Sequence, residues 1–155
     1  MGEHFKCLSA IFPIIMRTKD EKKQVLLLRR ENTGYMDGLW DFAGSGHVDE
    51  NESAMQAVVR ECREELGITV ELKDIRFVHL SHRVGQNGAR TYYDIYFLVE
   101  RYTGEPYIAE PEKCSGLQWF AMDELPEDII GIRKQAFLSY LKSEYYSEAV
   151  SYTHL

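Results

Sequence analysis

The sequence predicts an α/β fold in which helices cover both faces of a central mixed sheet. Segments with strand character lie on both sides of one long helical segment, residues 53–66. A second helical segment follows the last strand. The run Val25–Leu28 is apolar without interruption, as expected for a strand buried on both faces. Elements of these kinds pack in layers, with the sheet between the helices.

The first half of the chain supplies two strands and a loop. Leu8–Met16 is predicted to be a strand, and Pro13 within it points to an edge position or a bulge. Gln24–Arg30 is the second strand. Residues 31–46 hold four glycines and little periodicity, which predicts a loop that leads into the helix.

The second half supplies three strands and a helix. Strands are predicted at Ile75–His82, Thr91–Arg101 and Leu117–Ala121, with a hairpin turn at Asn87–Gly88. On the middle strand Tyr93, Ile95, Phe97 and Val99 are expected to share one face. The last helix is expected to open at Pro126 or Glu127 and to place Ile130, Phe137, Leu138, Leu141 and Tyr145 on its apolar side.

The helical segment 53–66 concentrates acidic side chains. It contains no Gly or Pro, can begin at Asn51 or Ser53 as N-cap, and ends at Gly67. An apolar stripe is formed by Met55, Val58, Val59, Cys62 and Leu66. Glu61, Glu64 and Glu65 lie together beside that stripe, because they are three or four residues apart.

Such a cluster of carboxylates is costly unless a cation is bound. Two like charges about 4–5 Å apart repel by roughly 4 kcal/mol at an effective dielectric constant near 20. An all-carboxylate set selects hard ions, Mg²⁺ or Mn²⁺, over zinc. A solvated acidic helix face is the alternative interpretation. The fixed offsets of Gly46, Glu52 and the Arg60–Glu61 pair favour a metal site instead.

The segment Gly46–Ile68 has the pattern G-x5-E-x7-R-E-u-x-E-E-x-G-u, where u is apolar, and it resembles the signature box of the Nudix hydrolases. The resemblance extends to Val25–Arg30, Gly38–Phe42 and Trp119–Pro126, and Leu98–Pro106 is similar to a segment of MutT-type members. It implies a Nudix-type α/β/α sandwich. It also implies hydrolysis of a nucleoside diphosphate linked to another moiety.

The resemblance assigns roles within the box. Glu64 and Glu65 match metal ligands of the family, and Glu61 matches a further ligand or the general base. Arg60 matches a residue that orients the catalytic glutamates, so Glu61, Arg60 and Glu64 are the expected catalytic group. The backbone carbonyl of Ser45 corresponds to a metal ligand in some members. Gly46, Glu52 and Gly67 are the structural positions, and Glu52 is expected to support the loop–helix geometry by hydrogen bonds or a salt bridge.

Candidates outside the box complete the predicted site. Glu110 matches a carboxylate that completes the metal set, and Glu112 competes with it and is also a candidate for substrate binding. Both could instead be solvated loop residues. Arg30 is a candidate phosphate contact or a surface salt bridge. Tyr35 is a candidate for contact with the base.

Other polar residues near the box are expected to be structural. His47 is predicted to be structural or exposed rather than a ligand. Arg83 and Arg90 flank the Asn87–Gly88 turn and are expected to form a charged hairpin rim, with contact to phosphates as the alternative. His79 and His82 are expected to point to opposite faces of their strand.

The expected reaction is MutT-like: Mg²⁺- or Mn²⁺-dependent conversion of a nucleoside triphosphate to the monophosphate and pyrophosphate. An ADP-ribose or nucleotide-sugar pyrophosphatase is the alternative, and a catalytically silent nucleotide-binding module is a third interpretation. The partner is therefore a small nucleotide, and family members often form homodimers.

Composition limits the number of domains, the kinds of partner and the location that can be expected. The 155 residues predict one domain over residues 1–146, with 147–155 as a flexible tail. A net charge of −7 argues against binding a nucleic-acid polymer. Three widely spaced cysteines predict neither disulfides nor a zinc site. We find no signal peptide and no membrane-spanning run, so a cytoplasmic protein is expected.

Overall fold

The computed structural model describes residues 2–151. In chain order the elements are β1 (Leu8–Lys19), β2 (Lys22–Arg30), β3 (Trp40–Phe42), β4 (Gly46–His47), α1 (Ala54–Leu66), the 3-10 helix η1 (Leu72–Asp74), β5 (Ile75–Gly85), β6 (Tyr92–Val99), β7 (Cys114–Ala121), α2 (Gly131–Leu141) and β8 (Tyr146–Ser151). No helix within the described range is long and apolar enough to cross a bilayer.

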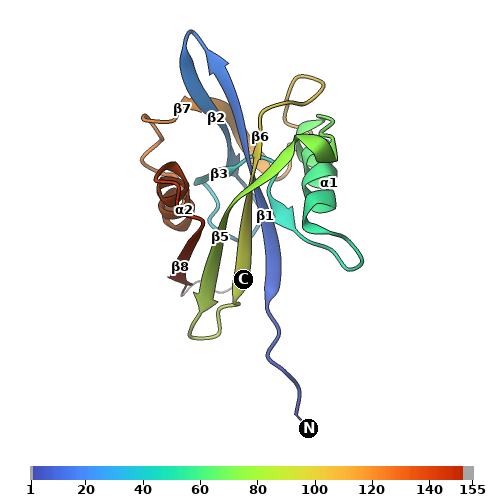
Figure 1. The fold of residues 1–155 in the computed structure, drawn as a ribbon, viewed down its shortest axis with the longest axis vertical. Helices are drawn as coiled ribbons and strands as arrows, with labels where there is room; N and C mark the ends of the chain where they lie inside the picture. The colour runs from blue at the N-terminus through green and yellow to red at the C-terminus, as the bar shows by residue number, and fades with distance from the viewer. Residues whose placement is uncertain (1, 152–155) are drawn as a thin grey trace.

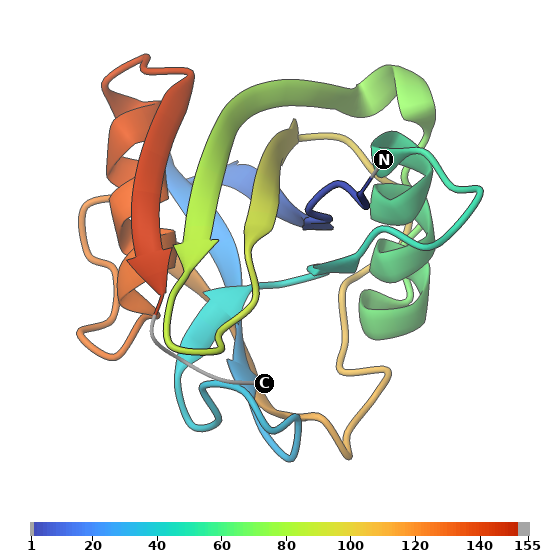
Figure 2. The same cartoon turned by 90° about the horizontal axis from the view of Figure 1, so that it is seen from below.

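The strands form one mixed sheet between two helices. Its strand order is β3-β2-β1-β6-β5-β8, with β4 also paired to β1 and β7 to β2. The pairs β1–β6 and β5–β8 are parallel, and the other pairs are antiparallel. Helices α1 and α2 lie on opposite sides of the sheet (Figures 1 and 2). The predicted α/β/α sandwich is confirmed.

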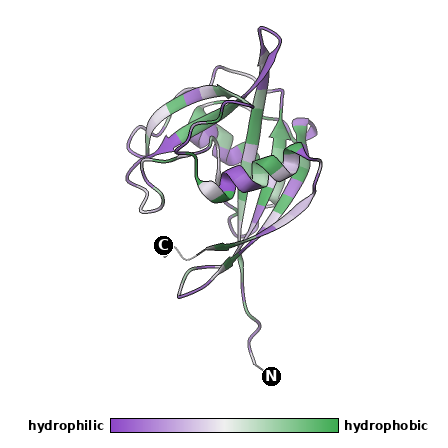
Figure 3. Ribbon diagram, turned by 90° about the vertical axis from the view of Figure 1, so that its left-hand side faces the viewer, coloured by the Kyte–Doolittle hydropathy of each residue, from purple (hydrophilic) through white to green (hydrophobic). Residues whose placement is uncertain are grey.

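Each helix closes its own hydrophobic core. On one side Val58, Cys62 and Leu66 of α1 are fully buried against one face of the sheet. On the other side Ala136 and Phe137 of α2 pack against the opposite face. The sheet is largely hydrophobic, and hydrophilic residues gather at the tip of the β1–β2 hairpin (Figure 3). Burying a side chain such as Leu66 contributes about 1.5–3 kcal/mol, so the α1 stripe can offset repulsion among the glutamates beside it.

Local interactions define both ends of α1. Ser53 is the N-cap, and its hydroxyl accepts a hydrogen bond from the Gln56 N–H while the Gln56 side chain accepts one from the Ser53 N–H. Gly67 ends the helix in the left-handed conformation with φ of 67°. Of the two predicted N-caps, Ser53 is therefore correct.

Pro13 lies where β1 changes partners. β1 pairs with β4 at Ala10 and Ile11 and with β2 from Met16 onward. Between these two pairings its only ladder is the parallel one to β6, in which Pro13 lies opposite Phe97. The missing N–H of proline therefore falls at a locally unpaired edge, as the sequence predicted.

The C-terminal part differs from the prediction. α2 begins at Gly131 rather than at Pro126 or Glu127, and Leu138 and Leu141 are exposed. Strand β8, Tyr146–Ser151, occupies much of the segment 147–155 that was predicted to be a flexible tail; residues 152–155 lie outside the described range.

A buried histidine, His79, holds strand β8 beside β5. The two ring nitrogens of His79 lie 2.8 Å from the carbonyl oxygen of Glu144 and 2.8 Å from the hydroxyl of Ser147. The Leu80 N–H also donates to the carbonyl of Tyr145 at 2.9 Å. These bonds join β5 to the chain that enters β8, and they link residues more than sixty positions apart, which local sequence patterns do not reveal.

Candidate active site

Arg60 is the centre of the hydrogen-bond network at the box. Its guanidinium donates two bonds to Glu52, at 2.7 and 3.0 Å, and one to Glu61 at 2.8 Å. Further bonds reach Glu64 at 3.2 Å and the carbonyl of His47 at 3.0 Å. One fixed cation thus orients carboxylates on α1 and ties the helix to the loop before it.

Glu61 extends from α1 against strand β4. A Cβ atom on Gly46 would overlap the carboxyl group of Glu61, so only glycine leaves room for this side chain. Burial raises the pKa of Glu61 to about 6, although the hydrogen bond and charge of Arg60 act in the opposite direction. The glycine of the box therefore determines where this carboxylate lies.

Glu65 is the most strongly perturbed acid of the site. Burial raises its pKa to about 8, against the effect of the Gly44 N–H, which donates a 2.8 Å hydrogen bond to Oε1. The charges that act on Glu65 come from Glu61, Asp41 and Glu110, and all of them are negative. None of the main charge effects on Glu65 comes from a cation.

A cleft of about 540 Å³ extends from the residues of the box to Tyr92 of β6 and Arg133 of α2. Glu61, Glu65, Glu110, Ser45 and Gly46 line it. We call the part lined by Glu61, Glu65 and Glu110 the acidic end. Glu64 does not line the cleft, and its side chain is 52% exposed.

The acidic end fits a hard divalent cation. Within residues 2–151, no three His, Cys, Asp or Glu side chains form a complete metal cage. Mg²⁺, however, is commonly bound through one or two carboxylates and keeps its remaining positions for water and phosphate. Glu61 and Glu65, two partly buried carboxyl groups that line one cleft, match that requirement.

The two candidate glutamates outside the box, Glu110 and Glu112, lie in different environments. Glu110 lines the cleft, whereas Glu112 does not; its side chain is exposed and only its carbonyl is engaged, by the Asn32 amide at 3.3 Å. The structure thus disfavours Glu112 as a substrate-binding residue, because its side chain lies outside the cavity.

Arg30 and Tyr35 both line the cleft, but the guanidinium of Arg30 already has hydrogen-bond partners within the protein. It donates to the carbonyl of Tyr35 at 2.7 Å, to the Thr33 hydroxyl at 3.0 Å and to Asp41 at 3.3 Å. Arg30 therefore holds the loop between β2 and β3 in place. Tyr35, only 7% exposed, projects from that loop into the cleft.

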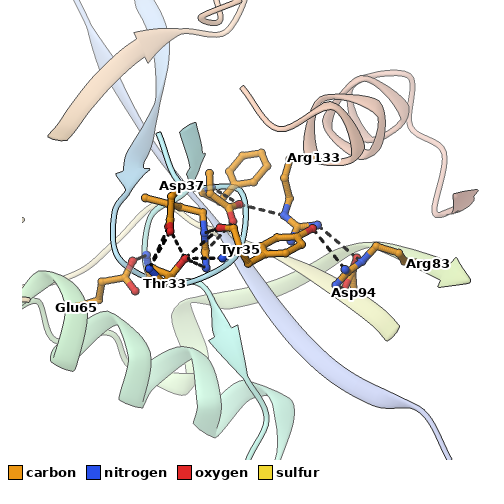
Figure 4. Close-up of polar contacts among 11 residues, drawn as sticks. Thr33, Tyr35, Asp37, Glu65, Arg83, Asp94 and Arg133 are labelled. Atoms are coloured by element: carbon orange, nitrogen blue, oxygen red, sulfur yellow. Dashed lines mark hydrogen bonds and ion pairs between the residues drawn. The ribbon is translucent and has the colours of Figure 1, made fainter. Parts of the chain in front are cut away.

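Sequence reasoning missed a buried set of charges opposite the acidic end. Arg83, expected at an exposed hairpin rim, is buried and pairs with Asp94 at 2.9 and 3.1 Å. Arg133 of α2 pairs with Asp41 at 3.0 Å and with Asp94 at 3.4 Å. We call Arg83, Asp94, Arg133 and Asp41 the arginine–aspartate network; Figure 4 shows Arg133, Arg83 and Asp94 beside Tyr35.

His47 has a structural contact, and it also lines the cleft. Its Nε2 lies 2.8 Å from the hydroxyl of Tyr92. Burial lowers the pKa of His47, and the charges of Arg90 and Arg83 lower it further, so the surroundings favour the neutral ring. Arg90 also lines the cleft, so it has access to a ligand there.

Comparison with known proteins places the chain in a family. The model of the NUDIX domain matches residues 10–141, most of the chain. The chain belongs to the Nudix hydrolase family. An 8-oxo-dGTP diphosphatase of Escherichia coli is 30% identical over 70% of this chain and 81% of that protein. An oxidized purine nucleoside triphosphate hydrolase of Danio rerio is 31% identical over 76% and 78%. The crystal structure of a MutT NUDIX hydrolase from Burkholderia pseudomallei, 26% identical, superposes with a TM-score of 0.75 over 86% of this chain and 98% of that one.

In this Nudix hydrolase the contact between Gly46 and Glu61 yields a prediction. Gly46→Ala is expected to displace the Glu61 carboxylate and to lower kcat by about 10- to 100-fold, because sub-ångström errors in placement are costly in catalysis. Gly131→Ala is the matched control, since a Cβ at Gly131 meets nothing within 4 Å. Steady-state turnover of both variants checks the prediction, and equal activity of the two would contradict it.

Proposed function

We propose that this protein hydrolyses a nucleoside triphosphate to the monophosphate and pyrophosphate. The observation that carries the proposal is one cleft with an acidic end at Glu61, Glu65 and Glu110 and buried arginines at the other end. Such a cleft can hold a metal-bound phosphate chain beside the helix and the rest of the nucleotide beyond it. The names of the E. coli and D. rerio relatives, both nucleotide hydrolases, support the substrate class.

The residues of the acidic end would hold Mg²⁺ or Mn²⁺. We assign Glu61, Glu65 and Glu110 to this role because they line one cleft, which Ser45 also lines. When bound, such an ion neutralises phosphate charge and lowers the pKa of a coordinated water. Arg60 keeps the carboxylates of Glu61 and Glu64 oriented, so we assign it a positioning role.

A substrate panel tests the proposal. Purified protein with Mg²⁺ is expected to turn over at least one deoxynucleoside triphosphate at least tenfold faster than ADP-ribose or a nucleotide sugar, and to release pyrophosphate rather than orthophosphate. The panel includes dGTP, 8-oxo-dGTP, dITP, dATP, dUTP and dCTP. Chelation of the metal with EDTA is expected to abolish turnover, and excess Mg²⁺ to restore it. Preferred turnover of ADP-ribose, or no turnover of any compound, would overturn the assignment.

A further inference from the structure

We propose that the end of the cleft lined by Arg83, Arg133, Tyr35 and Tyr92, which we call the inner end, binds the nucleobase and selects bases with a keto oxygen over bases with an amino group at the same ring position. This inference rests on the proposed function, because it assumes that the phosphates lie at the acidic end. The nucleobase is then the part of the substrate that reaches the arginines.

The inner end has hydrogen-bond donors to spare. A guanidinium carries five N–H groups. Arg133 uses Nε for Asp41 and Nη1 for Asp94, and the buried hydroxyl of Tyr96 lies beside its guanidinium, which leaves two of the five N–H groups. Arg83 gives Nε and Nη2 to Asp94, and its Nη1 lies 3.5 Å from the hydroxyl of Tyr35. Both arginines line the cleft, so their remaining N–H groups are available to a ligand.

The acceptors at this end are already engaged. Asp41 accepts from Arg133, from Arg30 and from the Phe42 N–H. Both oxygens of Asp94 accept from Arg83, and one of them also accepts from Arg133. Three guanidinium groups therefore face two carboxylates. The surface presented to a ligand has an excess of positive charge and of donors.

The position of Arg133 is unfavourable for the helix that carries it. It lies in the first turn of α2, where the helix dipole disfavours a cation, and that turn has no acidic residue and no side-chain cap. Its side chain is 3% exposed. The helix itself therefore does not favour an arginine at this position, which is held instead by Asp41 and Asp94 at the edge of the cleft.

Aromatic contacts hold both guanidinium groups in fixed planes. The Cζ of Arg133 lies 3.7 Å from the ring centre of Phe12, and the Cζ of Arg83 lies 4.0 Å from that of Tyr92. Tyr35 reaches over from its loop between Glu65 and the arginines (Figure 4). A flat base entering here meets the aromatic side chain of Tyr35 and rigid donor groups at the floor.

The excess of arginine donors over carboxylate acceptors predicts which bases are accepted. An arginine fork matches two acceptors on one base edge, such as O6 and N7 of a 6-oxopurine. An amino group at the same ring position would place donor against donor. A single bidentate match of this kind corresponds to roughly 10- to 100-fold discrimination.

Two matched substrate pairs test the inference. dITP and dATP differ at the purine 6-position, oxo against amino, and dUTP and dCTP differ in the same way at the pyrimidine 4-position. We expect kcat/KM for dITP to exceed that for dATP by about 10- to 100-fold, with the same direction for dUTP over dCTP. Equal values within each pair would overturn the inference while the proposed function stands. Turnover of dGTP or 8-oxo-dGTP with none of these four would also overturn the inference, whereas no turnover of any of the six would overturn the proposed function.

Variants assign the selectivity to the arginines. Arg83→Gln and Arg133→Gln are expected to bring the dITP/dATP ratio close to one; because both substrates are measured on one preparation, partial unfolding does not change the ratio. If either glutamine variant fails to fold, Arg83→Lys and Arg133→Lys keep the buried charge but lose the planar fork, and are expected to lower the ratio as well. Arg17→Gln is the control, because Arg17 lies on the β1–β2 hairpin and stacks on Trp119 outside the cleft. An unchanged ratio in the folded arginine variants would overturn the assignment.

Discussion

Glu65→Gln is expected to lower kcat by roughly a thousandfold while the protein remains folded. The substitution keeps the shape of the side chain and the oxygen that accepts from the Gly44 N–H. It removes a carboxyl group whose ionised form is disfavoured by burial and by Glu61, Asp41 and Glu110 in the metal-free protein. We therefore expect its thermal midpoint without metal to equal or exceed that of the original protein. A metal-ligand carboxylate that stabilises the transition state by about 4 kcal/mol accounts for a thousandfold loss of kcat.

A matched acidic residue controls for the general effect of removing one charge. Glu71 is also a glutamate, but it is exposed and only its ion pair with Lys73 would be lost. Glu71→Gln is expected to keep full activity. Turnover is measured at saturating substrate and Mg²⁺, and folding by circular dichroism. If Glu65→Gln retained more than a tenth of the original kcat, its role as a metal ligand would be refuted.

The sequence predicted the box and its helix well because their determinants are local. The N-cap at Ser53, the C-cap at Gly67 and the stripe of α1 depend on residues a few positions apart. The same spacing places Glu61 and Glu65 on the side of α1 that faces the cleft. The sequence did not reveal that Glu64 lies outside the cleft, because the direction of an exposed side chain depends on its partner. That partner is Arg60.

The arginine–aspartate network was missed because its members come from four separate elements. Two local patterns pointed to it nonetheless. Asp94 alternates with the buried Tyr92 and Tyr96 on one face of β6, which is an unusual place for a carboxylate. Arg133 lies four residues before the buried Phe137, on the inward side of α2. A charged residue on a predicted core face indicates a buried partner, but the sequence alone cannot identify which one.

The network makes a strong prediction for stability. Asp41→Ala is expected to lower the free energy of unfolding by about 3–5 kcal/mol, because it leaves the buried Arg133 with one partner fewer and removes the one carboxylate that pairs with Arg30. The Phe42 N–H, which donates to Asp41 at 2.7 Å, also loses its acceptor. Urea denaturation followed by tryptophan fluorescence measures the change.

Asp128 supplies the control, because it also pairs with an arginine but at the surface. Its contact with Arg29 is 3.5 Å long, and both side chains are more than 40% exposed. Asp128→Ala is therefore expected to cost less than about 1 kcal/mol. Similar losses for the two variants would show that the network contributes no more than a surface pair. A large loss for Asp41→Ala alone would show that the arginines are kept in place by carboxylates rather than by packing, and a base-selecting role for Arg83 and Arg133 requires that rigidity.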